Sequence, residues 1–299
     1  WLGHESLSGK TILLHAEAGL GDTLQFCRYA ELLARMGAQT IVAVPQTLIP
    51  VVKNAPGVHQ IMVLGESPPP FDCHCPMMSL PYALKTDLAT IPASVPYLFS
   101  EPSRLALWRS HLGPKSRPRV GLVWSGNPGH KNDHNRSISI ATLQPLLENE
   151  AIEWCSLQKE IREHDMAWLS SSPGIRHFGG YLHDFADTAA LVQLMDIVIT
   201  VDSGVAHLAG AMGRPVWILL PFNPDWRWLL GREDSPWYPS ARLFRQTAAG
   251  DWATVIQPVQ ERLKHWCKST TPAPHFRSYL PYLYAMATLL AISTYLLLR

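Results

Sequence analysis

The sequence has almost no net charge, and it contains few cysteines. Its 299 residues include 25 Lys and Arg against 24 Asp and Glu, which gives a formal net charge of +1. Such a chain has no overall attraction to nucleic acid or to an anionic surface, so any basic site must be local. The five scattered cysteines do not form the dense disulfide framework of a small secreted domain, and they favour a reducing, cytoplasmic compartment.

Several common catalytic motifs are also missing from the sequence. It contains no Gly-x-x-x-x-Gly-Lys-Ser/Thr, no His-Glu-x-x-His and no Gly-x-Ser-x-Gly. These absences argue against a P-loop NTPase, a common metalloprotease and a typical α/β-hydrolase. An Asp-x-Asp pair, which a metal-clamped sugar-nucleotide enzyme would use, is absent as well. Any bound diphosphate would therefore be neutralised by cationic side chains and backbone amides.

Cys73-His74-Cys75 is the one close pair of cysteines in the sequence. A tetrahedral zinc site needs four ligands, and no second Cys or His pair stands at ligand spacing. We therefore predict that these cysteines are half-buried strand residues, and that the protein uses neither a metal nor another cofactor.

The hydrophobic pattern predicts two α/β units. With 47% hydrophobic and 16% charged residues, the chain can form two domains, each with its own core. Short apolar runs alternate with helical periodicity from residue 11 onward, which is typical of a parallel sheet. A strand is expected at 11–16, followed by one helix that extends to Met36, whereas the proline-rich stretch 67–102 is expected to be irregular.

A polar linker at residues 113–118 precedes a restart of the same rhythm. We therefore predict an N-terminal domain over residues 1–113 and a C-terminal domain over residues 114–268. Between two such units we expect a cleft, with the carboxyl ends of the strands as its ligand-binding rim.

The remaining residues, 269–299, form a hydrophobic tail. Tyr279 to Leu298 is a run of twenty residues without a charge. A helix of that length spans about 30 Å, which matches the hydrocarbon core of a bilayer. Four tyrosines and Pro281 weaken this interpretation. The segment is either an anchor at the inner face of the membrane, a helix packed on the protein, or an unstructured tail.

The first candidate site follows the first strand. Gly19 and Gly21 have no side chains, so a substrate can approach the backbone closely there. Asp22 stands in the first turn of the next helix, where its carboxylate can act as a general base on a hydroxyl. Alternatively, Asp22 caps that helix, as Asp commonly does.

The second candidate site is the segment from Asp202 to His207, where a buried strand leads into a helix. The first amides of that helix, the hydroxyl of Ser203 and the bare backbone of Gly204 can bind a phosphate. His207 lies four residues after Ser203, hence on the same helical face, and can donate a hydrogen bond to the same ligand. Alternatively, Asp202 and Ser203 are capping residues and His207 belongs to the core.

The loop 125–137 follows another strand and is polar and locally basic. It opens with Ser125, Gly126 and Asn127, and it carries Lys131 and Arg136. The ammonium group of Lys131 and the forked guanidinium of Arg136 are both suited to binding a diphosphate. A solvated loop is the alternative interpretation.

Two further segments end strands in the predicted C-terminal domain. Gln158 and Lys159 follow one strand and can contact a nucleotide. Asp225 and Trp226 open a tryptophan-rich loop after the last strand. Aromatic faces at a cleft rim can stack on a base or a sugar, although large aromatic side chains more often fill cores.

Taken in order, these segments resemble the family 9 glycosyltransferases, which include the bacterial heptosyltransferases, and most of all a subgroup found downstream of tetratricopeptide repeats. The resemblance covers about residues 1 to 266. The motifs that carry it are Gly19-Leu20-Gly21-Asp22-Thr23, Trp124-Ser125-Gly126-Asn127-Pro128 with Lys131-Asn132 and Asn135-Arg136-Ser137, Ser156-Leu157-Gln158-Lys159, Asp184-Phe185-Ala186-Asp187-Thr188, Asp202-Ser203-Gly204-Val205-Ala206-His207-Leu208-Ala209, and Pro224-Asp225-Trp226-Arg227-Trp228.

The resemblance implies a glycosyltransferase-B fold, in which two Rossmann-like domains face each other across a cleft. It places the acceptor on the N-terminal domain and a nucleoside-diphosphate sugar on the C-terminal one. It also implies inverting transfer without a metal, with Asp22 as the catalytic base and Lys131 in the donor loop. Ser203, Gly204 and His207 match the helix start that holds the donor phosphates.

We therefore expect a hexosyl or heptosyl transferase whose acceptor is a hydroxyl of a carbohydrate, a lipid-linked molecule or a protein. The short N-terminal domain and the tryptophan-rich loop depart from heptosyltransferases, which leaves the transferred sugar open. Two alternatives remain. One is a non-catalytic nucleotide-sugar-binding or interaction module, and the other is a sugar-nucleotide epimerase, which needs no external acceptor.

Overall fold

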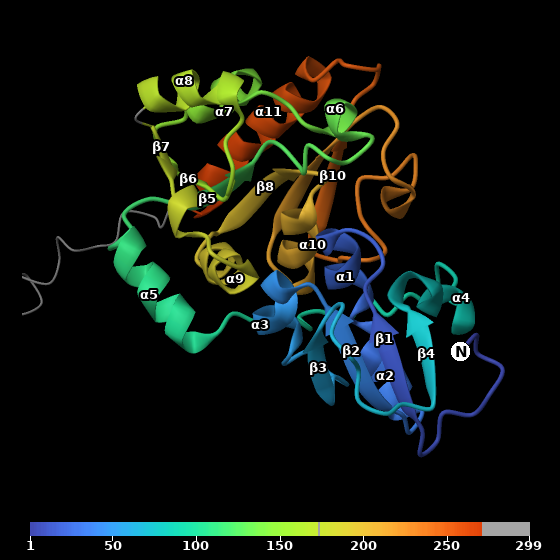
Figure 1. The fold of residues 1–299 in the computed structure, drawn as a ribbon. Coiled ribbons are helices and arrows are strands. Elements are labelled where there is room, and N and C mark those ends of the chain that lie inside the picture. The colour runs from blue at the N-terminus through green and yellow to red at the C-terminus, as the bar shows by residue number, and fades with distance from the viewer. Residues whose placement is uncertain (173, 271–299) are drawn as a thin grey trace, which may run out of the picture.

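The computed structural model describes residues 1–172 and 174–270, and these residues form two parallel sheets with helices around them (Figure 1). None of the helices in this part of the chain is long and apolar enough to cross a membrane. The predicted anchor at 279–298 lies outside the described residues, so that prediction is not tested.

The first sheet has four strands in the order β3-β2-β1-β4, all of them parallel. Its central strand alternates, so that Ile12 and Leu14 are fully buried while their neighbours are half-buried. The strands are β1 (Thr11–His15), β2 (Gln39–Val44), β3 (Gln60–Val63) and β4 (Cys73–Pro76). The accompanying helices are α1 (Leu20–Phe26), α2 (Tyr29–Arg35), η1 (Gln46–Leu48), α3 (Ile49–Val52), η2 (Met77–Ser79), α4 (Leu80–Ala83) and α5 (Pro102–Leu112).

The second sheet has six parallel strands in the order β10-β9-β8-β5-β6-β7. Every residue of its inner strands β8 and β9 is buried, as expected for strands covered on both faces. The strands are β5 (Arg119–Val123), β6 (Glu153–Ser156), β7 (Ile175–His177), β8 (Ile197–Val201), β9 (Val216–Leu220) and β10 (Ala241–Arg245). The helices are α6 (Asp133–Arg136), η3 (Ile140–Leu143), α7 (Gln144–Leu147), α8 (Glu163–Ser171), η4 (Gly179–Tyr181), α9 (Phe185–Gln193), α10 (Gly204–Ala211), η5 (Trp226–Trp228) and α11 (Ala253–Thr270).

Both sheets reverse their strand order once. The chain builds β1, β2 and β3 in one direction and then places β4 on the other side of β1. It repeats this in the second sheet, where β8 returns to the free side of β5. At such a reversal the loops after the two central strands diverge and leave a crevice for ligands. The motifs predicted after β1, β5 and β8 all lie at these two points.

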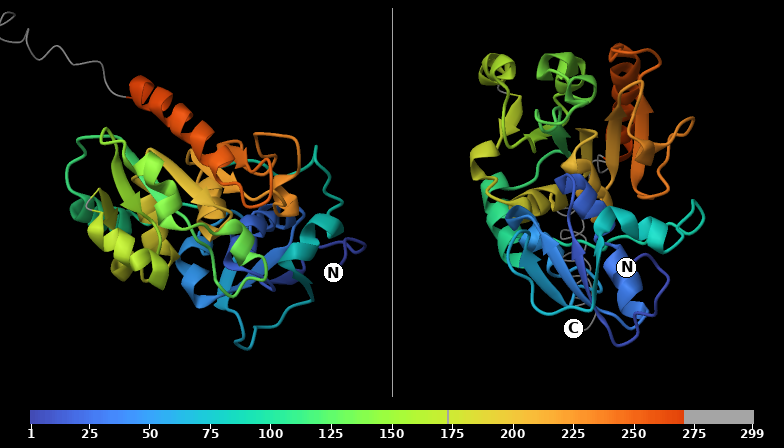
Figure 2. Two further views of the ribbon diagram at one scale, coloured as in Figure 1. Left: turned by 90° about the horizontal axis from the view of Figure 1, so that it is seen from above. Right: turned by 45° about the vertical axis from the view of Figure 1, so that its right-hand side comes forward.

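The two sheets share one hydrophobic core. A single buried cluster runs from Leu7 in the first unit to Leu243 in the second, while a separate cluster covers the other face of the six-stranded sheet. Helix α5 packs on α9, with Arg104 and Trp108 both bonded to the buried carboxylate of Asp187. In the right-hand view of Figure 2 the second unit lies directly above the first. This contact fixes the loops of one sheet relative to those of the other.

The structure corrects one predicted helix. The helix expected to run from Asp22 to Met36 is instead two helices, α1 and α2, with Cys27 and Arg28 between them. The side chain of Arg28 donates from Nε to the carbonyl of Gln25 at 2.9 Å. A continuous helix would use that carbonyl for the N–H four residues later. The Arg28 side chain therefore occupies an acceptor that a continuous helix would need.

The structure confirms the strand predicted for Cys73 and Cys75, and it shows one strand that the sequence pattern did not predict. β4 lies within the stretch expected to be irregular, where Cys75 is buried and Cys73 is partly exposed, in keeping with the strand interpretation of this pair. β10 forms an outer edge of the six-stranded sheet. Both are short edge strands. Their extended conformation depends more on pairing with β1 and β9 than on the strand propensity of their own residues.

Candidate functional site

The starts of α1 and α10 meet at the contact between the two units (Figure 1). Gly21 makes this approach possible. A Cβ on Gly21 would lie 2.7 Å from Cδ2 of His207 and 3.6 Å from the Cα of Gly204. The missing side chain therefore lets α1, which follows β1, pack against the beginning of α10, which follows β8. As a result, Asp22 and Ser203 are brought to the same place from opposite units.

The carboxylate of Asp22 is held on both of its oxygens. Oδ2 accepts a hydrogen bond of 2.7 Å from the backbone N–H of Gly19, and Oδ1 is paired with Nη2 of Arg227. The side chain remains 23% exposed. The carboxylate thus caps the helix start, as the alternative interpretation has it, while its role as a general base stays a prediction.

Arg227 was missed by the sequence reasoning. It lies in η5 of the second unit and its side chain is 7% exposed. Its Nε donates to Oε1 of Gln25 at 2.7 Å, and its Nη1 donates to Oδ1 of Asp225 at 2.8 Å. The guanidinium also covers the ring of Trp226, at 4.6 Å from the ring centroid. The motif Pro224-Asp225-Trp226-Arg227-Trp228 contains Arg227, but its contact with Asp22 spans 205 residues of sequence and could not be predicted from that motif.

The amino-terminal end of α10 lies at the contact with α1, and it has the features of an anion site. Ser203 precedes the helix in extended conformation, and its hydroxyl lies 3.0 Å from that of Thr200 without capping the helix. The first amides of the helix have no acceptor within it. Together with the helix dipole they favour a negatively charged group near Gly204.

Asp202 is a buried carboxyl beside this helix start. Burial raises the pKa of Asp202 to about 6. The indole N–H of Trp228 opposes this rise, although it faces the carboxyl without forming a full hydrogen bond. The positive charges of Arg136 and Arg227 oppose it too. Arg136 also donates from Nη1 to the backbone carbonyl of Asp202 at 3.0 Å. The carboxyl therefore changes charge close to neutral pH.

We expect Asp202→Asn to become more stable relative to the wild type as pH rises. Between the ordinary pKa of 3.8 and about 6, the native state holds a proton that the unfolded state has lost. Wild-type stability therefore falls as pH rises through that window, and the neutral Asn does not share this loss. The difference should grow by about 3 kcal/mol between about pH 4 and pH 7. Urea unfolding of both proteins at the two pH values measures it, and a constant difference would contradict the assignment.

His207 is buried, in keeping with the alternative interpretation that it belongs to the core. Its ring is stacked on Trp228, and Nδ1 lies 2.9 Å from the hydroxyl of Tyr238. Burial, followed by the charges of Arg227, Arg28 and Arg136, lowers the pKa of His207 well below its usual value. The imidazole is therefore neutral at physiological pH. Its contact with a donor phosphate stays a prediction, because the ring faces Gly21 and α1 in this structure.

The loop 125–137 is held by charged side chains. Arg136 lies against Gly126, where an added Cβ would be 2.7 Å from Nη2, and it is 3.5 Å from the carboxylate of Asp133. Arg162, which the sequence analysis did not identify, pairs with the same carboxylate. Lys131, in contrast, is exposed and has no hydrogen bond or ion pair within residues 1–172 and 174–270. The cation that is available to a ligand in this loop is therefore Lys131.

The remaining predicted residues either brace these loops or lie on the surface. The amide of buried Gln158 bonds both backbone groups of Ser125 and so joins the loop after β6 to the loop after β5. Lys159 is exposed and donates to the carbonyl of His183 at 3.3 Å. The side chain of Asn127 accepts from the amide of Gly129 within its own turn. Trp226 is 54% exposed beside the site, where its ring is open to a ligand.

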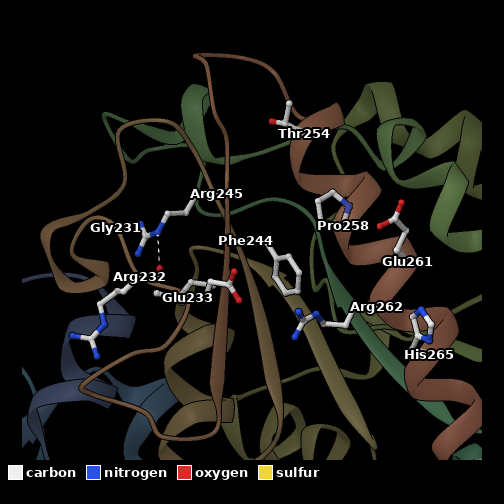
Figure 3. Close-up of a pocket in the computed structure, with 11 residues that line it drawn as sticks. Gly231, Arg232, Glu233, Phe244, Arg245, Thr254, Pro258, Glu261, Arg262 and His265 are labelled. Atoms are coloured by element: carbon white, nitrogen blue, oxygen red, sulfur yellow. Dashed lines mark hydrogen bonds between the residues drawn. The ribbon is translucent and has the colours of Figure 1, made fainter.

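A separate cavity of about 810 Å³ lies between β10, α11 and residues 231–233 (Figure 3). None of the predicted site residues lines it. Two of its arginines do not converge on one point, because Arg245 is bound to the carbonyls of Trp228 and Arg232 while Arg262 comes from the helix on the other side. The cavity is thus distinct from the place where Asp22 meets α10.

Within the described residues, no three His, Cys, Asp or Glu side chains are grouped so as to hold a metal ion. Cys27, Cys73, Cys75 and Cys155 are free thiols. The charged and polar groups described at the site are carboxylates, guanidinium groups, Lys131 and backbone amides.

The chain resembles glycosyltransferases in sequence and in structure. Residues 183–220, which include α9, β8, α10 and β9, match the model of glycosyltransferase family 9 (heptosyltransferase). The family 9 glycosyltransferase of Veillonella parvula superposes with a TM-score of 0.60 at 12% identity, over 87% of this chain and 90% of that one. The ADP-heptose lipopolysaccharide heptosyltransferase II of E. coli gives a TM-score of 0.57 at 16% identity, over 87% and 99% of the two chains.

The chain has the glycosyltransferase-B fold. This confirms the predicted fold class of two Rossmann-like parallel-sheet units. A curated relative, protein FlbA of Caulobacter vibrioides, is 26% identical over 294 residues, which cover 90% of this chain. The chain spans about half of the length of that relative, 48%. The family match and the fold together support glycosyl transfer as the kind of chemistry.

Proposed function

We propose that this glycosyltransferase-B chain is an inverting glycosyltransferase that transfers a sugar from a nucleoside-diphosphate sugar to a hydroxyl without a metal. The observation that carries this proposal is the packing of α1, which holds the partly exposed carboxylate of Asp22, against α10. A base and an anion site face each other across the contact between the two units. Transfer of a glycosyl group needs both, one for the acceptor hydroxyl and one for the departing diphosphate.

Each residue has a distinct role in this proposal. Asp22 takes the proton of the acceptor hydroxyl as its oxygen attacks the anomeric carbon. The bond from that carbon to the diphosphate breaks, and the electron pair leaves with the nucleoside diphosphate. The amides at Gly204, the hydroxyl of Ser203 and the ammonium of Lys131 stabilise the developing negative charge. Arg136 supports that anion site through its bond to the carbonyl of Asp202.

The domain roles follow from this arrangement. We assign acceptor binding to residues 1–113 and donor binding to residues 114–268, and we place the protein in the cytoplasm or at the inner face of the membrane. The acceptor is a hydroxyl of a carbohydrate, a lipid-linked molecule or a protein. The similar E. coli enzyme is named for ADP-heptose, so an ADP-activated heptose is the first donor to test, with hexose donors beside it. Membership of the subgroup found downstream of tetratricopeptide repeats stays a prediction.

A screen of nucleotide sugars tests the proposal. We would incubate the protein with ADP-heptose and with UDP-, GDP- and TDP-hexoses, and record thermal shift, nucleoside diphosphate release and the sugar products. Stabilisation with release of nucleoside diphosphate supports a transferase. Stabilisation without release, whichever acceptor is added, favours the binding module. Conversion of one nucleotide sugar into another without release favours the epimerase.

We expect sugar transfer and donor binding to survive EDTA. Cationic side chains and helix amides can neutralise the diphosphate in this proposal, so removal of divalent ions should leave both the rate and the thermal shift unchanged. The measurement compares activity after EDTA treatment with activity after added Mg²⁺ or Mn²⁺. A complete loss that either ion restores would contradict metal independence.

A further inference from the structure

The orientation of Asp22 depends on the opposite unit of the molecule. Its Oδ2 is fixed by Gly19 of its own unit, but its Oδ1 is paired with Arg227 of the other unit. We infer that Arg227 is a positioning residue, which aligns the Asp22 carboxylate with the acceptor only while the two units are in contact. The inference rests on the proposed function, in which Asp22 is the general base.

Arg227 is itself held rigidly. Three of its nitrogens serve three different side chains, since Nε donates to Gln25, Nη1 donates to Asp225 and Nη2 pairs with Asp22. The rings of Phe26 and Trp226 lie 5.5 and 4.6 Å from its guanidinium carbon. A planar guanidinium fork holds its donors in one fixed plane, whereas the three donors of a lysine ammonium rotate about the end of a flexible chain. The guanidinium thus sets both the place and the plane of the carboxylate.

The paired carboxylate keeps the capacity to accept a proton. Each carboxylate oxygen has two acceptor positions, and the contacts with Gly19 and Arg227 use one on each oxygen. The side chain is also partly exposed. The two bonds therefore fix the carboxylate group against rotation about its Cβ–Cγ bond, and they leave a lone pair for the acceptor hydroxyl.

A second buried arginine offers a matched control. Arg28 also crosses between the units, since it donates to the carbonyls of Pro92 and Trp237 and to the hydroxyl of Tyr97. It makes no hydrogen bond or ion pair with Asp22 among the described residues. Arg28→Lys therefore lowers the stability of the protein without removing a partner of the base, and in the molecules that stay folded the two units are still in contact.

The experiment is a double-mutant cycle on the purified chain. We would prepare Arg227→Met, Asp22→Asn, the double variant and the control Arg28→Lys, and confirm by circular dichroism that each is folded at the assay temperature. Turnover is measured with ADP-heptose. If the wild type does not turn over ADP-heptose, we would use the nucleotide sugar that it turns over fastest in the screen. kcat and KM for the donor are recorded separately.

We expect Arg227→Met to lower kcat about 10- to 100-fold while KM for the donor stays near the wild-type value, because misplacement of a reacting group by about 1 Å has effects of this size. In the Asp22→Asn background the same substitution should cause no further loss, since the two residues act as one unit. Arg28→Lys should lower the melting temperature but leave kcat near wild type. Guanidinium chloride at millimolar concentration should partly restore kcat to Arg227→Ala.

Three results would overturn the positioning role. These are an unchanged kcat in Arg227→Met, a loss that adds fully to that of Asp22→Asn, and an equal loss of kcat in Arg28→Lys. Failure of the proposed function looks different. In that case the wild type turns over none of the nucleotide sugars, or Asp22→Asn is as fast as the wild type.

Discussion

Replacement of Asp22 by Asn is expected to lower the rate of sugar transfer by about 10² to 10⁴, the usual contribution of a general base. Asn has the shape of Asp, and its amide oxygen can still accept the hydrogen bond from the backbone N–H of Gly19. It cannot take a proton from the acceptor hydroxyl. The start of α1 should therefore persist while the chemical step is lost. Initial rates of nucleoside diphosphate release at saturating donor and acceptor measure the effect.

Two comparisons make the result specific. Glu31→Gln removes a carboxylate from the surface of α2, where it is paired only with Arg35 of its own helix, and should transfer sugar at the wild-type rate. The thermal shift of Asp22→Asn with the donor should match that of the wild type, because the donor is assigned to the other unit. Undiminished transfer by Asp22→Asn would remove this residue from the mechanism.

The largest expected effect on stability comes from Arg28→Met, which should lower the free energy of unfolding by about 3–5 kcal/mol. Arg28 is 4% exposed, and its guanidinium bonds the carbonyls of Pro92 and Trp237. It also lies over the rings of Tyr97 and Tyr238, at 4.4 and 4.8 Å from their centroids. Methionine fills part of the space but leaves the buried carbonyls without donors, and each such group costs about 1–3 kcal/mol.

Urea unfolding followed by circular dichroism measures this loss. Arg35→Met is the matched control, because Arg35 is an exposed arginine on the neighbouring helix with one surface ion pair. It should change the free energy of unfolding by less than about 1 kcal/mol. If the two arginine substitutions destabilise the protein equally, Arg28 does not hold the units together.

The sequence by itself determined the class of fold and the segments predicted to bind ligands. Alternating apolar runs and helical periodicity identified most of the strands, and a parallel sheet requires that their carboxyl ends share one edge. That rule was enough to select Gly19 to Asp22, the loop 125–137 and Asp202 to His207. These motifs are local, since each combines the end of a strand with the start of the next element, and a local pattern can be read without the tertiary structure.

Only the tertiary structure decided which side chains meet between the units. Arg227 contacts Asp22 across 205 residues of sequence, and Arg28 contacts Trp237 across 209. Such pairs depend on how two separately folded sheets pack, and neither periodicity nor spacing within one segment carries that information. The structure also gave Gly21 a role beyond ligand approach, because its missing Cβ lets α1 pack against His207. Close packing is a property of both surfaces together, so one segment alone could not reveal it.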